Sequence, residues 1–273
     1  IEPPTTAVPT FETYEQALAW LETERTNLLA ATNVGDPRYT SRLSPTIWRY
    51  LYLRGYHDDA LTLHSNAQQA AQETGERVLE GQAVYNLGTS FERLGRYKDA
   101  EAHLIEALAI LQETGTRPLE GHVANSLGML YSWRRDHDRA VAYYRQAAAI
   151  GHETGTSVLE GHALDNLGIV HAELGELDDA IALYQRALAI FAQIDTPYLQ
   201  SAALDNLGAA FNELGRHTEA REHLEHALRL GQQAGNRDFQ VEALNSLVAN
   251  ALSMGDPERA REYARQAVTI SEE

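Results

Sequence analysis

Cysteine is absent from this 273-residue chain, so it can form neither a disulfide nor a zinc site built on thiolates. Positive charge is also scarce. There are 22 basic residues against 39 acidic ones, Lys98 is the only lysine, and the net charge is −17. Surfaces that bind nucleic acid are basic because they displace counterions from phosphates. We therefore expect this segment to bind neither nucleic acid nor an anionic membrane.

Long apolar runs and targeting signals are missing as well. No stretch approaches the ~18 apolar residues that span a bilayer. Ile1–Pro9 holds no basic segment followed by an apolar one, so no secretory signal is expected. We expect a cytoplasmic protein. Because the chain does not begin with methionine, we also expect a piece of a longer or processed chain.

Motifs for catalysis are absent too. Neither the nucleophile motif GxSxG nor the phosphate-binding motif GxxxxGK[ST] occurs in the sequence. His122 and His162 share one repeat position, and no acidic third ligand accompanies them. His223 and His226 lie three residues apart, a possible ligand spacing, but no carboxylate near them recurs at a matching spacing, so we expect these histidines to be solvated or at the edge of the core. The sequence therefore predicts no enzyme, no catalytic residue, no metal site and no cofactor.

What the sequence does contain is an internal repeat of 40 residues. The matching blocks YNLG, NSLG, DNLG and DNLG end at Gly88, Gly128, Gly168 and Gly208. Alanine follows twelve residues after each glycine, at Ala100, Ala140, Ala180 and Ala220. A first copy with Trp48 and a last copy with Val248 at the glycine position keep the same frame. Such self-similarity is the signature of a repeat architecture.

Each copy is expected to form two helices. In the fourth copy, apolar residues recur at helical spacing from Leu164 to Leu174 and again from Ile181 to Phe191. Gly175 between the two runs is typical of a left-handed C-cap. Glycine inside a helix costs ~1 kcal/mol relative to alanine. We therefore expect the repeat glycines to lie where two helices cross too closely for a Cβ, opposite the alanine of the partner helix.

The third copy departs from this pattern at its turn. Arg135 stands where the other copies have glycine. A left-handed conformation costs a residue other than glycine roughly 1 kcal/mol. We predict that Arg135 adopts a positive φ or that the turn is reshaped around Asp136.

The order L-G-x-x-[YF], then G-x-x-x-x-A, then A-L resembles the tetratricopeptide repeat over residues 41–272. The resemblance implies an all-α, right-handed α-solenoid of helix-turn-helix repeats. It implies six helix pairs in one superhelical domain at 41–273, after an introductory helix and linker at 1–40. The copies exceed the family's usual ~34 residues, as in the long-helix subgroup of peptide-sensing and scaffold proteins.

A separate amphipathic helix is predicted before the repeats. Thr13 and Gln16 form a capping-box pattern, and Leu18, Leu21 and Leu28 are expected to face inward. The pattern A-W-L-E-x-E-R-x-N-L-x-A-A at 19–31 resembles the helix that introduces the repeats in AfsR-type actinobacterial regulators and in nucleotide-switch ATPases of the STAND class. In those proteins the repeats act as the sensor of a P-loop ATPase. The resemblance thus implies an upstream ATPase module, outside this chain, as a possible partner.

The family resemblance also implies which side chains face the groove, because the first helix of each pair lines the concave face. An asparagine recurs there in five successive copies. A primary amide offers two donors and an acceptor, so this ladder can hold an extended peptide backbone. The alternative is that the amides cap or bridge neighbouring helices. The candidate groove residues are Tyr85, Asn86, Thr89, His122, Asn125, Met129, Trp133, His162, Asp165, Asn166, Asp205, Asn206, Asn212, Glu242 and Asn245.

The expected groove lacks the lysines and arginines that bind carboxylate ends in some family members. Its distal part is instead acidic, while Met129 and Trp133 offer an apolar patch. The acidic residues are Asp165, Glu173, Asp205, Glu213 and Glu242. These features favour a partner segment with Arg or Lys beside a large apolar residue. The alternative is that the charged face is only solvated.

The sequence therefore predicts a protein- or peptide-binding repeat region. We expect the sensor or partner-binding part of a bacterial transcriptional regulator or nucleotide-switch signalling protein. A free-standing scaffold or adaptor, or a peptide-pheromone receptor, is the alternative.

Overall fold

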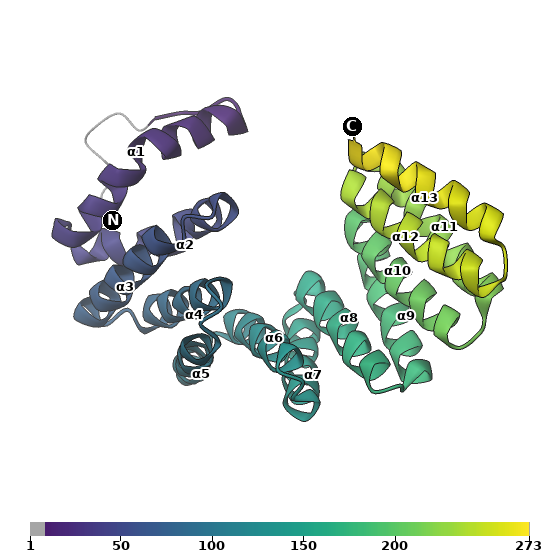
Figure 1. The fold of residues 1–273 in the computed structure, drawn as a ribbon. Helices are drawn as coiled ribbons and strands as arrows, with labels where there is room; N and C mark the ends of the chain where they lie inside the picture. The colour runs from purple at the N-terminus through teal and green to yellow at the C-terminus, as the bar shows by residue number, and fades with distance from the viewer. Residues whose placement is uncertain (1–8, 273) are drawn as a thin grey trace. The chain divides into compact units, whose positions relative to one another are not determined.

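The computed structural model describes residues 9–272. Residues 1–8, where no secretory signal is expected, lie outside the described residues. Within this range the chain forms thirteen α-helices and no strand (Figure 1). One introductory helix and twelve repeat helices are thus confirmed. No described helix has the length and apolar character needed to cross a membrane. The helices are α1 Tyr14–Val34, α2 Pro37–Arg54, α3 His57–Thr74, α4 Arg77–Arg93, α5 Tyr97–Glu113, α6 Arg117–Trp133, α7 His137–Thr154, α8 Ser157–Glu173, α9 Leu177–Gln193, α10 Pro197–Glu213, α11 His217–Gln233, α12 Arg237–Ser253 and α13 Pro257–Glu272.

The contacts divide the chain into two compact units. The first ends at Thr116 and holds α1 to α5, and the second begins at Arg117 and holds α6 to α13. Each repeat copy remains a pair of helices, from α2 and α3 to α12 and α13. That all six pairs form one superhelical domain stays a prediction.

In the second unit, the first helices of successive pairs form a row. Helix α8 contacts α6 and α10, and α10 contacts α12. The second helices pack behind this row and supply much of the core. Tyr184 of α9, for example, packs with Leu207 and Phe211 of α10. The row places one face of α6, α8, α10 and α12 side by side, and this face carries most of the candidate groove residues.

Thr13 caps the start of helix α1 as the sequence predicts, whereas the Gln16 side chain accepts from the backbone N–H of Glu12 and not from that of Thr13. The Thr13 hydroxyl accepts a hydrogen bond from the backbone N–H of Gln16 at 3.3 Å. Leu18, Leu21 and Leu28 pack against the buried core of α2 and α3, which confirms their inward orientation. Helix α2 already begins at Pro37, inside the segment expected to be a linker.

From α2 onward, the turns between helices are closed by residues with left-handed backbone. Gly175 has φ 78°, and Arg135 has φ 60°, which confirms the prediction for the third copy. Asp195 also has a positive φ, 48°, where the corresponding turns of other copies use Gly115 or Gly155. The left-handed backbone of Asp195 was not predicted, although Asp195 follows Gly115 and Gly155 in the 40-residue frame.

The repeat glycines do face a crossing helix, and a large side chain lies closest to them. A Cβ on Gly128 would lie 2.6 Å from the ring of Tyr144, and one on Gly168 would lie 2.6 Å from the ring of Tyr184. These large residues follow the repeat alanine by four positions, one helical turn later. The glycines therefore make room for a large side chain. The alanine is a close neighbour at Gly208, where a Cβ would also lie 3.2 Å from the Ala220 carbonyl oxygen.

Candidate functional site

Most candidate groove residues lie on the row of first helices in the second unit. Trp133 ends α6, and Asn245 lies on α12, the last first helix. Three candidates belong to α4 of the first unit, so they are described separately. By helix, the candidates are Tyr85, Asn86 and Thr89 on α4; His122, Asn125, Met129 and Trp133 on α6; His162, Asp165 and Asn166 on α8; Asp205, Asn206 and Asn212 on α10; and Glu242 and Asn245 on α12.

A ladder of side-chain hydrogen bonds joins the first helices of the second unit. The Asn166 amide donates to Asn125 Oδ1 at 3.3 Å, which links α8 to α6. The Asn206 amide donates to both oxygens of Asp165, the shorter distance being 3.2 Å to Oδ2. The last rung is a hydroxyl, because Ser246 Oγ donates to Asp205 Oδ2 at 3.1 Å. In each rung a side chain reaches back to the preceding copy.

The first unit repeats this arrangement in its core. Asn86 is buried, and its amide donates to Ser44 Oγ at 3.0 Å. Burial lowers the pKa of His64 to about 3, so its ring is neutral at physiological pH. Ser44 Oγ lies 2.8 Å from His64 Nδ1 and can donate to it while accepting from Asn86. The hydroxyl of Thr89 is also used within its own helix, since it donates to the Asn86 carbonyl.

These bonds show what the ladder amides contact within the protein, while their contact with a ligand stays a prediction. Asn86, Asn166 and Asn206 bridge neighbouring helices, and Asn125 accepts one of the bridges, so these amides are part of the interhelix packing. The bridging alternative therefore describes their main contacts. Sequence alone did not separate the donors from the acceptors, because the asparagine shifts between two adjacent positions of the repeat.

Two carboxylates of the ladder lie in an environment that disfavours their charge. Burial raises the pKa of Asp165 to about 6, although the Asn206 amide acts in the opposite direction. Burial also raises the pKa of Asp205; the Ser246 hydroxyl opposes this rise, and the negative charge of Glu242 adds to it. Asp205 Oδ1 is buried and has no hydrogen-bond donor among the described residues. A buried acceptor without a donor destabilises a fold by about 1–3 kcal/mol.

Negative charge extends around these two carboxylates. The pKa of Tyr184 is raised first by burial and then by the charges of Asp165, Glu213 and Glu173. Glu173 has a cationic neighbour, since Arg135 lies 3.4 Å away. Glu213 and Glu242 are exposed. The second unit thus presents an acidic strip along α8, α10 and α12.

Helix α6, which precedes the strip in the row of first helices, is less polar. Trp133 is 60 % exposed, and Met129 is partly buried one helical turn earlier. The Asn125 amide points toward the Met129 sulfur at 3.8 Å. His122 and His162 lie on the same row, and burial lowers the pKa of both, with His122 lowering that of His162 further. Both rings therefore favour the neutral form.

The remaining candidates differ from one another. Asn212 accepts from the buried amide of Asn250 at 3.1 Å and lies 2.8 Å from His217 Nδ1, so it joins α10 to α11 and α12. Its place in a binding groove stays a prediction. Asn245 is exposed on α12. Among the described residues, α12 is the first helix of the last pair, so no later copy reaches back to Asn245.

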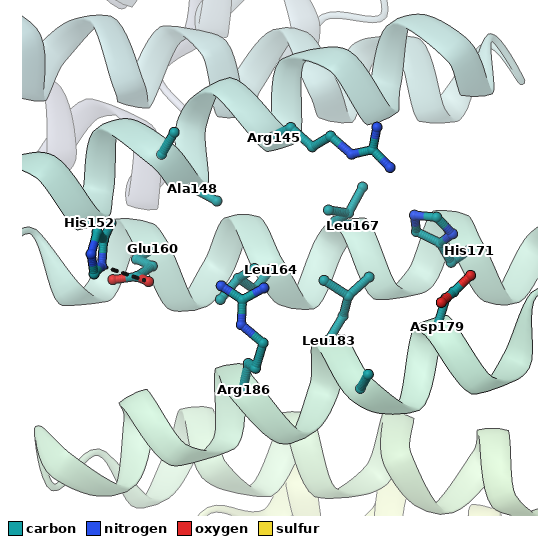
Figure 2. Close-up of a pocket in the computed structure, with 12 residues that line it drawn as sticks. Arg145, Ala148, His152, Glu160, Leu164, Leu167, His171, Asp179, Leu183 and Arg186 are labelled. Atoms are coloured by element: carbon teal, nitrogen blue, oxygen red, sulfur yellow. Dashed lines mark ion pairs between the residues drawn. The ribbon is translucent and has the colours of Figure 1, made fainter.

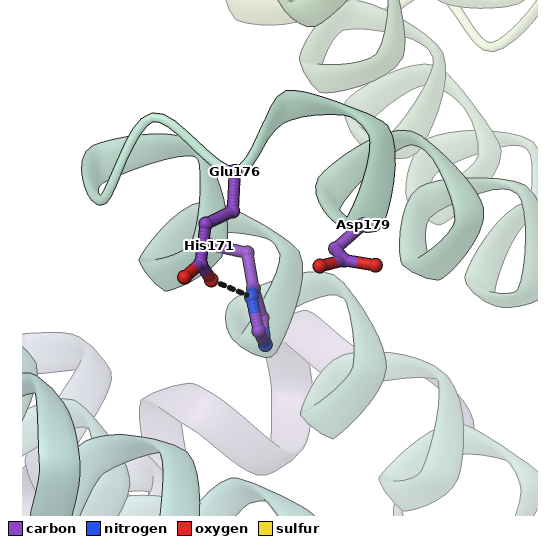
Figure 3. Close-up of side chains that lie close together, drawn as sticks. All are labelled: His171, Glu176 and Asp179. Carbon is purple, nitrogen blue, oxygen red and sulfur yellow. Dashed lines mark hydrogen bonds and ion pairs between the residues drawn. The ribbon is translucent and has the colours of Figure 1, made fainter.

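A possible metal site lies elsewhere in the second unit. Among the described residues, His171, Glu176 and Asp179 bring one ligand atom each to within 4.8 Å of one another (Figure 3). His171 Nδ1 lies 2.6 Å from Glu176 Oε2, so this pair is satisfied without an ion. This group was not predicted, because its members lie on both sides of the turn between α8 and α9. The expectation that the chain binds no metal stays a prediction.

The family of the chain follows from its repeats. The family model of the tetratricopeptide repeat matches residues 49–113, 119–193 and 199–273, which together exceed half of the chain. The chain therefore belongs to the tetratricopeptide repeat family, whose repeats form a scaffold for binding proteins. No curated protein matches the chain.

Several solved structures share the fold. BtubC from P. vanneervenii has a TM-score of 0.69 and 21% identity, over 79% of this chain and 91% of that protein. The STAND protein with a tetratricopeptide repeat sensor from Pyrococcus horikoshii has a TM-score of 0.76 and 14% identity. That match covers 93% of this chain but 40% of the STAND protein. A Rap protein complexed with competence and sporulation factor has a TM-score of 0.62 and 15% identity, over 94% and 77% of the two chains. At these identities the similarity shows the fold alone.

Proposed function

We propose that the acidic strip of the second unit binds a polypeptide segment that carries Arg or Lys beside a large apolar residue. The observation that carries the proposal is the environment of Asp205. One of its carboxylate oxygens is buried without a donor among the described residues, and its pKa is raised. Perturbed carboxylates of this kind concentrate at functional sites.

A basic side chain suits this strip for two reasons. A guanidinium or ammonium group supplies the N–H donors that Asp205 Oδ1 lacks, and charge-assisted bonds are stronger than neutral ones. A cation also favours the ionised form of Asp165, whose pKa burial has raised to about 6. Binding should therefore release a proton from Asp165 at mildly acidic pH.

The apolar part of the segment would lie against α6. Trp133 and Met129 offer an exposed aromatic ring and an adaptable thioether at that end of the row. Tryptophan is frequent among the residues that contribute most to binding energy. The neutral forms favoured by His122 on α6 and His162 on α8 would not repel a basic segment.

In the cell, the chain would act as the sensor region of a cytoplasmic bacterial signalling protein or transcriptional regulator. The resemblance of residues 19–31 to the introductory helix of AfsR-type regulators supports this role. The fold shared with the STAND sensor over 93% of this chain supports it too. In such a protein the bound segment would shift a neighbouring ATPase between two states, which requires a different affinity for each state.

Two alternatives remain: a free-standing scaffold or adaptor, and a peptide receptor. The fold shared with a Rap protein complexed with competence and sporulation factor supports the second. The genomic sequence upstream of the Ile1 codon separates the first alternative from the sensor. An in-frame GxxxxGK[ST] motif there would support the sensor, and a start codon at that point would support the scaffold.

The binding itself can be tested by selection from a random-peptide phage library on the purified chain. We expect selected peptides to share Arg or Lys next to Trp, Phe or Leu. The double variant D165N/D205N should lose these peptides. E222Q/E262Q is the matched control, because it removes two charges from exposed positions on α11 and α13. Peptides without basic residues, or equal recovery by D165N/D205N, would contradict the proposal.

A further inference from the structure

A second concave site lies in the same unit, away from the acidic strip. A cavity of about 630 Å³ is lined by α7 and α9, with α8 between them (Figure 2). Sites for small ligands commonly enclose ~300–1,000 Å³. The size of this cavity therefore matches a small molecule.

The cavity and the acidic strip use different sides of α8. Glu160, Leu164, Leu167 and His171 line the cavity and recur at the spacing of one helical stripe. Asp165, by contrast, belongs to the ladder on α8. At ~100° per residue, the stripe that holds Asp165 and its neighbours lies roughly opposite the cavity stripe. A ligand in the cavity would not compete directly for the strip.

The floor and walls of the cavity differ in chemistry. Leu164 and Leu167 of α8 and Leu183 of α9 give it an apolar surface. Arg145 reaches into it from α7 and Arg186 from α9, as Figure 2 shows. Both arginines are exposed, and neither forms an ion pair with any of the described residues. The chain has a net charge of −17, so two guanidinium groups without an ion-pair partner at one cavity are unusual in it. Together they can bind an anion.

The acidic residues of the lining lie at the ends of the cavity. Glu160 lies 3.3 Å from His152 Nδ1 at one end. Asp179 lies beside His171 at the other end (Figure 2). Each carboxylate thus has an imidazole near it. The space between the arginines is the part of the cavity where an anion would meet the least negative charge.

From this arrangement we infer that the cavity binds a small organic carboxylate with an apolar body. The carboxylate would lie between Arg145 and Arg186, because a guanidinium group forms paired hydrogen bonds to carboxylate oxygens. The apolar body would cover the leucines of the floor, and its removal from water would add to the affinity. This site is independent of the proposed peptide-binding strip.

The test uses decanoate as the probe, with calorimetric titration of the whole chain at pH 7.5. We expect saturable binding of decanoate at one site, and no comparable binding of decylammonium. R145Q/R186Q should weaken decanoate binding at least tenfold, whereas R229Q, an exposed arginine of α11 outside the cavity lining, should not. A182W should also abolish binding, because it fills the cavity without changing its charge. Circular dichroism must show that each variant is folded.

Three results would overturn the inference. One is the absence of decanoate binding, and another is equal affinity for decanoate and decylammonium. The third is an unchanged affinity in folded R145Q/R186Q. A second copy of the chain could occupy the cavity instead. Sedimentation would then show a dimer that R145Q/R186Q dissociates and decanoate does not, which would also refute a small-molecule site.

Discussion

Replacing Asp165 with asparagine should make the protein more stable at pH 7.5. Burial raises the pKa of Asp165 from its ordinary value of 3.8 to about 6, so ionisation of this side chain opposes folding. Each factor of ten in proton affinity corresponds to about 1.4 kcal/mol, and the whole effect is about 3 kcal/mol. Asn125 occupies this position in the preceding copy and accepts the Asn166 amide, so asparagine fits the ladder.

The gain should depend on pH. A carboxylate whose pKa is raised on folding destabilises the protein fully above pH 6, and its effect fades as the pH falls toward 4. The destabilisation by Asp165 should shrink to about 1 kcal/mol at pH 4.5. The new amide donor lacks a partner, which should remove about 1 kcal/mol of the gain at either pH. D165N should therefore gain about 2 kcal/mol at pH 7.5 and almost nothing at pH 4.5.

Thermal unfolding of the wild-type chain and D165N at the two pH values measures this difference. A change of 1 kcal/mol corresponds to roughly 2–4 °C in Tm for a domain of this size. The control E222Q should show no such gain at pH 7.5, because Glu222 is exposed. Equal effects of D165N at both pH values, or a loss of stability at pH 7.5, would refute the assignment of a destabilising charge.

Three further substitutions test the packing. N166A/N206A should lower stability by about 1–3 kcal/mol for each lost bridge, because each amide joins two helices. The loss should be visible as a lower Tm. An unchanged Tm would favour the hypothesis that these amides contact a ligand instead of holding the helices together. R135G should raise stability by about 0.5–1 kcal/mol in urea unfolding, because glycine accepts φ 60° without strain; a loss would contradict strain at this turn. G168A should destabilise the protein by about 1–3 kcal/mol, since the new Cβ would lie 2.6 Å from the Tyr184 ring. A gain in stability of ~1 kcal/mol, which alanine usually gives over glycine inside a helix, would show that the ring moves aside.

Much of the fold could be predicted because the repeat frame carries it. The spacing of leucines and glycines gave the helix pairs, and the frame alone identified the strained turn at Arg135. The same frame could not show what faces each repeat glycine. Helix-crossing geometry, not sequence spacing, brings Tyr144 and Tyr184 to these positions.

The candidate site was harder to predict, since its chemistry depends on burial. Asp165 and Asp205 were identified as groove residues, but the sequence does not show that their charges are desolvated. The amide ladder was found, but its hydrogen bonds connect copies and depend on how the helices stack. The cavity between α7 and α9 was missed, because Arg145 and Arg186 lie on different helices and share no motif.

Small-angle X-ray scattering tests the prediction that the six helix pairs form one continuous superhelix. One continuous superhelix predicts that the distance distribution extends to at least about 60 Å, from six stacked pairs with helices ~8–10 Å apart. It also predicts a single conformation across protein concentrations. A profile that fits only a mixture of arrangements of the units before and after Thr116 would contradict it.

The most direct test of the proposed function is the affinity of one selected basic-apolar peptide as a function of pH. Fluorescence anisotropy should show the tightest binding at pH 7.5 and a progressive loss below pH 6, because Asp165 must be ionised to bind a cation. D165N/D205N should bind at least tenfold more weakly at pH 7.5 and lose this pH dependence, and E222Q/E262Q should behave like the wild type. An affinity that is independent of pH between 5 and 7.5, and equal in D165N/D205N, would contradict the proposal that these carboxylates bind the partner.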